Sequence, residues 1–184
     1  MRRFFLPVIL SFILFSSCTM ILSRNIPGKP EKSLPKEWIG KYEVISSPYF
    51  PEKRDTAQHE KEYATIETKR IIWESKDGTK TYSLDDSLRY SVIYGQSRYL
   101  SLLMPEGLYA IFKVVKKNDT LELYSLSSED EPRKGELNRY FDKVEKMKKD
   151  EDEYYKVTIV DKKLDAYFKS SIPSKDVTKL VPVK

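Results

Sequence analysis

Short segments rich in β-forming residues, separated by turn-forming residues, fill most of the chain between residues 38 and 126. Val, Ile, Thr, Tyr, Phe and Trp favour strands, whereas Gly, Asn, Asp and Pro between such runs favour turns. We expect eight strands, at residues 38–46, 63–68, 70–75, 79–84, 88–94, 98–104, 108–115 and 120–126. This pattern restricts the chain to a mainly β fold.

The connections between most of these segments are short. Asp77-Gly78 separates two β-like runs, and both residues tolerate the positive φ of a tight hairpin turn. Gly95 and Asn118-Asp119 occupy corresponding positions between later runs. Consecutive strands with short connections form an antiparallel meander, and eight strands suffice to close a barrel. We therefore expect an antiparallel meander that closes into a barrel or a strongly curved sheet.

The C-terminal third has a different pattern. Apolar residues fall at helical spacing and predict an amphipathic helix over residues 133–149, namely Leu137, Tyr140, Phe141, Val144 and Met147. One strand is expected at residues 154–160, and Asp161 is placed to cap a short helix after it. Residues 178–183 are expected to form an edge segment, because Pro182 is unsuited to the centre of a sheet.

The N-terminal end has the pattern of a secretory signal peptide. Arg2 and Arg3 precede an apolar run at residues 4–15, and small residues lead from there to Cys18. A basic end, an apolar run of roughly 7–15 residues and a small-residue exit define such a signal. We therefore expect residues 1–17 to be removed. Cys18 is the only Cys in the chain, so it has no partner for a disulfide within the chain.

The stretch from Leu14 to Cys18 resembles the lipobox of bacterial lipoproteins. The resemblance implies that the Cys18 thiol carries diacylglycerol and that the protein attaches to a membrane through this lipid. Residues 18–36 would then be a lipidated tether with little structure, and residues 37–184 a single β-rich domain. Two alternatives stay open: residues 4–22 form an uncleaved membrane anchor, or Cys18 is incidental to ordinary secretion.

The residues after Cys18 bear on location. Thr19 lacks the negative charge that retains enterobacterial lipoproteins at the inner membrane, so the resemblance implies the outer membrane. The chain as a whole resembles small lipoproteins common in Bacteroidetes, whose surface-exposed members tend to carry acidic residues just after the Cys. Met20, Ile21 and Leu22 are not acidic, so we expect a location in the cell envelope that faces the periplasm.

The motif Trp38-x-Gly40-x-Tyr42 resembles the first strand of the calycins, the superfamily of lipocalins and fatty-acid-binding proteins. The resemblance implies a barrel whose interior can hold one small ligand. We expect an apolar or amphipathic ligand in contact with inward-facing residues such as Trp38, Tyr42, Phe112 and Val114. The alternative is that Trp38 closes the barrel end as part of the core, because aromatic side chains mainly contribute burial.

Few residues offer catalytic chemistry. His59 is the only His, whereas a zinc site needs several His or Cys ligands. The chain lacks Gly-x-Ser-x-Gly and phosphate-binding Gly loops. Asp85-Asp86 follows a strand and is typical of a turn, and the acidic run at residues 150–153 lacks a calcium-loop pattern. We therefore expect no catalytic residues, no metal and no cofactor. A hydrolase that uses two carboxylates remains a third hypothesis.

The charge pattern also limits the choice of partners. The net charge is +5, but lysines and acidic residues are interleaved, whereas a nucleic-acid binder usually has a concentrated basic stripe. We expect no nucleic-acid binding. The leading hypothesis is a lipid-anchored, non-enzymatic binding or accessory domain. The alternative is a protein-interaction module, such as an assembly factor or an inhibitor, because the chain has 13 Tyr and Tyr is enriched at binding hot spots.

Overall fold

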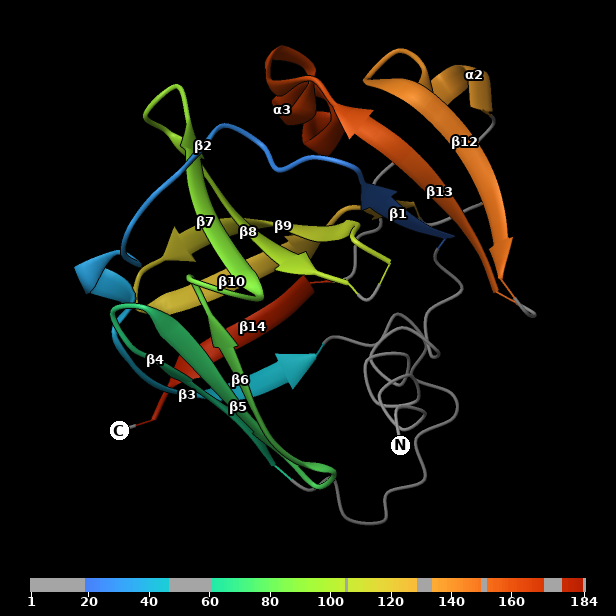
Figure 1. The fold of residues 1–184 in the computed structure, drawn as a ribbon. Coiled ribbons are helices and arrows are strands. Elements are labelled where there is room, and N and C mark those ends of the chain that lie inside the picture. The colour runs from blue at the N-terminus through green and yellow to red at the C-terminus, as the bar shows by residue number, and fades with distance from the viewer. Residues whose placement is uncertain are drawn as a thin grey trace.

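The computed structural model describes residues 19–46, 61–104, 106–128, 134–149, 152–170 and 177–183. These ranges are mainly β (Figure 1). In chain order the elements are β1 (Thr19–Ser23), β2 (Lys29–Pro30), η1 (Lys36–Trp38), β3 (Gly40–Ser46), β4 (Glu62–Ile66), β5 (Arg70–Ser75), β6 (Gly78–Ser83), β7 (Leu88–Ile93), β8 (Ser97–Leu103), β9 (Tyr109–Lys117), β10 (Thr120–Ser125), β11 (Ser127–Ser128), α2 (Lys134–Leu137), β12 (Phe141–Lys149), β13 (Asp152–Ile159), α3 (Asp161–Lys169) and β14 (Val177–Pro182). Residues 1–18, which include the expected signal peptide and Cys18, lie outside the described residues, as does His59.

Most of the described strands form a strongly curled antiparallel half-barrel, in the order β7-β8-β9-β10-β14-β3-β4-β5-β6 (Figure 1). Short turns join most neighbours, so strands that follow each other in the chain also pair in the sheet. All eight predicted strands lie within two residues of their expected bounds. Only Trp38 differs in kind, because it ends the 3-10 helix η1 instead of beginning β3.

The prediction that residues 178–183 form an edge segment is wrong. β14 lies inside the half-barrel, where it pairs with β10 on one side and β3 on the other. Pro182 is the last residue of the strand, opposite Tyr42. A proline at a strand end removes little from the ladder of backbone hydrogen bonds, so the strand can occupy a central position.

The expected tether is also wrong for the described part of residues 18–36. β1 lies in the sheet between β13, to which it is parallel, and β9 and β11, to which it is antiparallel. The apolar run that follows Cys18 explains this position, because Ile21 and Leu22 are buried. The folded part of the described residues therefore includes Thr19, well before the expected boundary at residue 37.

The amphipathic helix predicted at residues 133–149 is wrong as well. Within residues 134–149, which the structure describes, only α2 is helical, and β12 follows it as a strand that pairs with β13. A β-bulge between Asp142 and Glu145 shifts the register, and Lys143 has a φ of 48°. The bulge lets Phe141 and Val144, three residues apart, face the same core. A helical turn followed by a bulged strand thus produced the spacing that indicated a helix.

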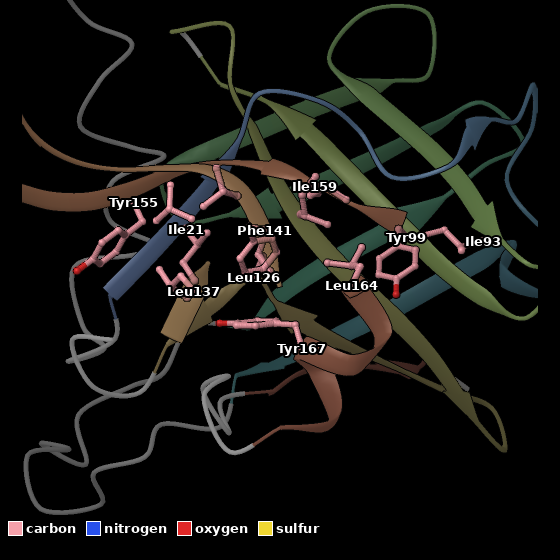
Figure 2. Close-up of a cluster of buried hydrophobic side chains, with 13 residues drawn as sticks. Ile21, Ile93, Tyr99, Leu126, Leu137, Phe141, Tyr155, Ile159, Leu164 and Tyr167 are labelled. Carbon is pink, nitrogen blue, oxygen red and sulfur yellow. The ribbon is translucent and has the colours of Figure 1, made fainter. Parts of the chain in front are cut away.

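Two apolar cores lie on opposite faces of β7, β8 and β9. The barrel core fills the concave side of the half-barrel and consists of Leu34, Trp38, Tyr42, Ala64, Ile66, Ile71, Leu84, Leu88, Tyr90, Leu100, Val114, Leu121 and Leu180. The α3 core lies under α3 and the β12–β13 hairpin (Figure 2) and consists of Ile21, Ile93, Tyr99, Ile111, Leu126, Leu137, Phe141, Val144, Tyr155, Val157, Ile159, Leu164 and Tyr167. Alternate residues of each of these strands pack into different cores, because successive side chains of a strand point to opposite faces of the sheet.

The segment between β1 and η1 crosses the side of the half-barrel between β7 and the β4–β5 turn. The Glu31 amide donates to the Tyr90 carbonyl, and the Leu34 amide donates to the Thr68 carbonyl. Gly28 is required here: its φ is +59°, and a Cβ would meet the Val92 carbonyl oxygen at 3.0 Å. This segment places Trp38 at the end of the barrel core.

Candidate functional site

The structure brings the four predicted ligand residues together in one place. Trp38, Tyr42 and Val114 belong to the barrel core, and Phe112 is partly buried against it. Trp38 is fully buried and meets Tyr90 edge-on at 5.3 Å between ring centroids. Their inward orientation is therefore as expected, and neighbouring apolar side chains surround them. Their role in ligand binding stays a prediction.

The motif Trp38-x-Gly40-x-Tyr42 shapes the end of the half-barrel. The Tyr42 hydroxyl donates to the Trp38 carbonyl at 2.9 Å, so the strand holds the end of η1 in place. Gly40 lies between them with a φ of +156°, which residues other than glycine rarely adopt. Outside the core, the Arg98 guanidinium lies over the Trp38 ring at 5.7 Å and donates to Glu37 at 2.8 Å. Trp38 therefore closes this end of the barrel.

A hollow of about 590 Å³, open to solvent, lies at the end of the half-barrel that Trp38 closes. Four separate parts of the chain meet there: η1, the start of β3, the β9–β10 turn and the end of β14. The lining residues are Glu37, Ile39, Gly40, Lys41, Tyr42, Lys116, Asn118, Asp119, Thr120, Val181, Pro182 and Val183. Of the four predicted ligand residues, only Tyr42 lines it.

The hollow combines an apolar surface with charges. Ile39 and Val183 are among the few large apolar side chains that the described residues leave exposed, at 44% and 47%. Isolated exposed apolar residues are ordinary; these two line the same hollow. Lys41 and Lys116 also line it, as do the acidic Glu37 and Asp119, and Lys41 pairs with Glu74 at 3.1 Å. The lining therefore places an apolar surface beside charges of both signs, which suits a molecule with an apolar part and a charged part.

Glu37 is held ionised beside these lysines. The hydrogen bond between the Glu37 carboxyl and the backbone of Glu37 itself lowers the pKa of this carboxyl most, and the side-chain hydrogen bond from Arg98 lowers it further. Lys116 donates to the Glu37 backbone carbonyl at 3.0 Å, which positions the ammonium group without neutralising it. Burial, followed by the negative charge of Asp119, raises the pKa of Tyr42. The Tyr42 phenol is therefore neutral at physiological pH.

Local sequence patterns did not indicate most of this hollow. They predicted a turn at Asn118-Asp119, and Asn118 has the positive φ of 54° that such a turn requires. They also predicted an edge segment at residues 178–183, which separated Val183 from Ile39. The juxtaposition depends on β14 pairing with both β10 and β3, which no local pattern reveals.

A second polar cluster joins α3 to the half-barrel. Asp165 accepts hydrogen bonds from Ser97 at 2.6 Å, Tyr99 at 2.8 Å and Lys113 at 2.7 Å. Burial acts to raise the pKa of Asp165, but these three donors outweigh it, and the net effect is a lowered pKa. Burial and the bond to Asp165 raise the pKa of Tyr99 far above its usual value. Because these groups satisfy one another, we interpret the cluster as a structural contact.

Other chemical candidates are dispersed. Asp85 and Asp86 are exposed in the β6–β7 turn. The Glu62 carboxylate accepts from the Trp73 indole at 3.1 Å. Within the described ranges, no three His, Cys, Asp or Glu side chains are grouped to hold a metal ion. Asp161, the expected helix cap, is instead the first residue of α3 and accepts from the Gly28 amide at 3.0 Å.

Comparisons with protein-family models, curated proteins and solved structures gave no match to this chain. The helices in the described part of the chain are all too short or too polar to span a bilayer.

Proposed function

We propose that this protein is a non-enzymatic binding domain, anchored in the cell envelope by a lipid on Cys18, that binds an amphipathic molecule in the hollow over Tyr42. The observation that carries the proposal is the combination of exposed Ile39 and Val183 with charged residues around one hollow, namely Lys41, Lys116, Glu37 and Asp119. Apolar contacts would supply affinity, and a lysine would orient the charged end of the ligand.

The size and openness of the hollow define the ligand further. Ligand pockets commonly measure about 300–1,000 Å³, and this hollow, at about 590 Å³, lies inside that range. Because it is open to solvent, part of the bound molecule would remain in water. In this proposal Trp38, Phe112 and Val114 support Tyr42 from the barrel core, and the ligand contacts Tyr42 itself.

The proposed location rests on the N-terminal sequence. A signal peptide over residues 1–17 and the lone Cys18 support a lipid anchor, and Thr19 supports the outer membrane with the domain facing the periplasm. The calycin-like motif at residues 38–42 is compatible with a binding role and adds no identity for the ligand.

A fluorescent amphipath tests the binding site. Dansylated undecanoic acid has an apolar chain and a carboxylate, and its fluorescence reports on transfer from water. We expect the double variant Ile39→Asp, Val183→Asp to weaken its binding at least tenfold, a loss of about 1.4 kcal/mol, because two carboxylates replace the apolar rim.

Ile45→Asp is the matched control, because Ile45 is 47% exposed on β3 but does not line the hollow. We expect this variant to bind the probe as the unmodified protein does. Equal affinity in all three proteins, or the same loss in the control, would reject the hollow as the site.

A protein partner is the second candidate, favoured by the exposure of Ile39 and Val183 at the rim. In that case the hollow would receive a side chain of another envelope protein. A photo-crosslinking residue at position 183 would then form one discrete adduct in cells, and Ile39→Asp would abolish it. A chain that binds the probe and forms no adduct favours the small amphipath.

A further inference from the structure

A row of three partly exposed side chains crosses the β12-β13-β1 part of the sheet, next to the proposed lipid. Met147 of β12 lies opposite Tyr154 of β13, and Tyr154 lies beside Met20 of β1. All three are partly buried. Directly paired residues project from the same face of a sheet. Because Ile21 and Tyr155, their chain neighbours, enter the α3 core, this row lies on the opposite, outer face.

Met20, at one end of this row, is close to Cys18 along the chain. Met20 is two residues from Cys18, and consecutive Cα atoms are about 3.8 Å apart. β1 begins at Thr19 and is paired on both sides, with β13 and with β9 and β11 (Figure 1). The structure therefore offers no flexible spacer between the sheet and the residue that carries the lipid.

The neighbouring side chains suit a membrane surface. Lys156 lies on the same outer face as the row, next to Leu22. Arg24 comes directly after β1; its guanidinium donates to the Lys143 carbonyl and pairs with Glu145, which lies opposite Lys156. Tyr and Met can enter the region between headgroups and acyl chains, while Lys156 can extend its ammonium group to anionic headgroups.

We propose that the outer face of the β1-β13-β12 sheet lies directly on the phospholipid surface, with Met20, Tyr154 and Met147 in the interfacial layer. The proposal rests on the proposed lipid anchor at Cys18. One acyl anchor combined with an apolar and cationic surface holds a protein on a membrane more firmly than the anchor does by itself. The domain then has a fixed orientation on the membrane.

Insertion of a spacer tests the contact. The full chain is expressed, recovered from membranes and added to phosphatidylethanolamine and phosphatidylglycerol vesicles, either unmodified or with twelve Gly and Ser residues inserted between Cys18 and Thr19. Such a spacer lets the domain move roughly 20 Å from the lipid. Peroxymonosulfate, a charged oxidant confined to water, then converts exposed methionines to sulfoxides, and mass spectrometry measures the rates at Met20 and Met147. A free methionyl peptide in the same sample reports the oxidant dose.

We expect oxidation of Met20 and Met147 to be at least fivefold slower in the unmodified chain than in the spacer variant. Equal thermal unfolding of the two chains checks that both fold alike. Equal oxidation rates in two chains that both carry the lipid mass would overturn the membrane contact and leave the anchor intact. Absence of the lipid mass from Cys18 would instead overturn the anchor, and the contact with it.

Discussion

At the scale of single residues, the position of Trp38 depends on its neighbours more than on its own propensity. The sequence pattern predicts Trp38 in a strand, whereas it ends η1 and closes the barrel core. Its alternation with Gly40 and Tyr42 suggested a strand, but only Gly40 and Tyr42 belong to β3, and Gly40 has a φ of +156°. The inward orientation of Trp38 was predictable, because large aromatic residues in such a chain are mostly buried.

Replacing Trp38 tests how much this closure stabilises the fold. We expect Trp38→Ala to lower the free energy of unfolding by about 3–5 kcal/mol, as is typical when a fully buried aromatic side chain is removed. Denaturant unfolding followed by circular dichroism measures the change. Tyr94→Ala is the control, because Tyr94 is 67% exposed, and its effect should stay within about 0.5 kcal/mol. Similar losses in both variants would contradict the assigned role of Trp38.

Asp165 gives a prediction about pH. Its lowered pKa means that the ionised form is favoured in the folded state, so its stabilising effect is present above the usual value of 3.8 and is lost as the pH falls through the lower folded-state pKa. We expect Asp165→Asn to destabilise the protein by about 1–3 kcal/mol at neutral pH. The difference between the two proteins should shrink below the usual pKa of an Asp side chain.

Unfolding midpoints measured from neutral pH to strongly acidic pH check this prediction. Tyr99→Phe serves as a comparison, because it removes one of the three donors and leaves Lys113 and Ser97 on Asp165. It should cost less than Asp165→Asn. A stability difference between Asp165→Asn and the unmodified protein that stays constant across the whole pH range would refute the assigned linkage.

At the scale of elements, local patterns identified the regular strands well but missed the bulge in β12 and the pairing of β1. Period-two alternation and turn residues located the strands of the half-barrel, because each hairpin is a local structure. The β12 bulge changed the period from two to three, and the resulting pattern mimicked a helix. The pairing of β1 with β13 joins segments more than 130 residues apart, as in Met20 with Tyr154. Nothing in the local sequence of residues 19–23 indicates such a partner.

Lys143 tests the bulge directly. Its φ of 48° is unfavourable for a residue with a side chain, so we expect Lys143→Gly to stabilise the protein by about 0.5–1 kcal/mol. Lys148→Gly, in the regular part of β12, should destabilise it instead, because glycine weakens a strand. Thermal unfolding compares the two variants. A loss of stability in both would argue against the bulge at Lys143.

At the scale of the whole molecule, the two proposed sites lie in different parts of the sheet. The half-barrel holds the hollow at its closed end, where η1, β3, the β9–β10 turn and β14 meet. The β1-β13-β12 sheet holds the residues next to Cys18. The sequence predicted both the lipid site and a curved sheet, but not where the hollow would lie. That position depends on the placement of β14 between β10 and β3, which is a property of the complete sheet.

Mass spectrometry of the intact protein recovered from bacterial membranes reports the lipid on Cys18 and a bound molecule in one experiment. We predict a chain that begins at Cys18 with a diacylglyceryl mass and carries an amphipathic molecule. We also predict that Ile39→Asp with Val183→Asp removes this molecule while Ile45→Asp retains it. A chain with an unmodified Cys18 would contradict the anchor. A molecule retained equally by all three proteins would contradict the binding site.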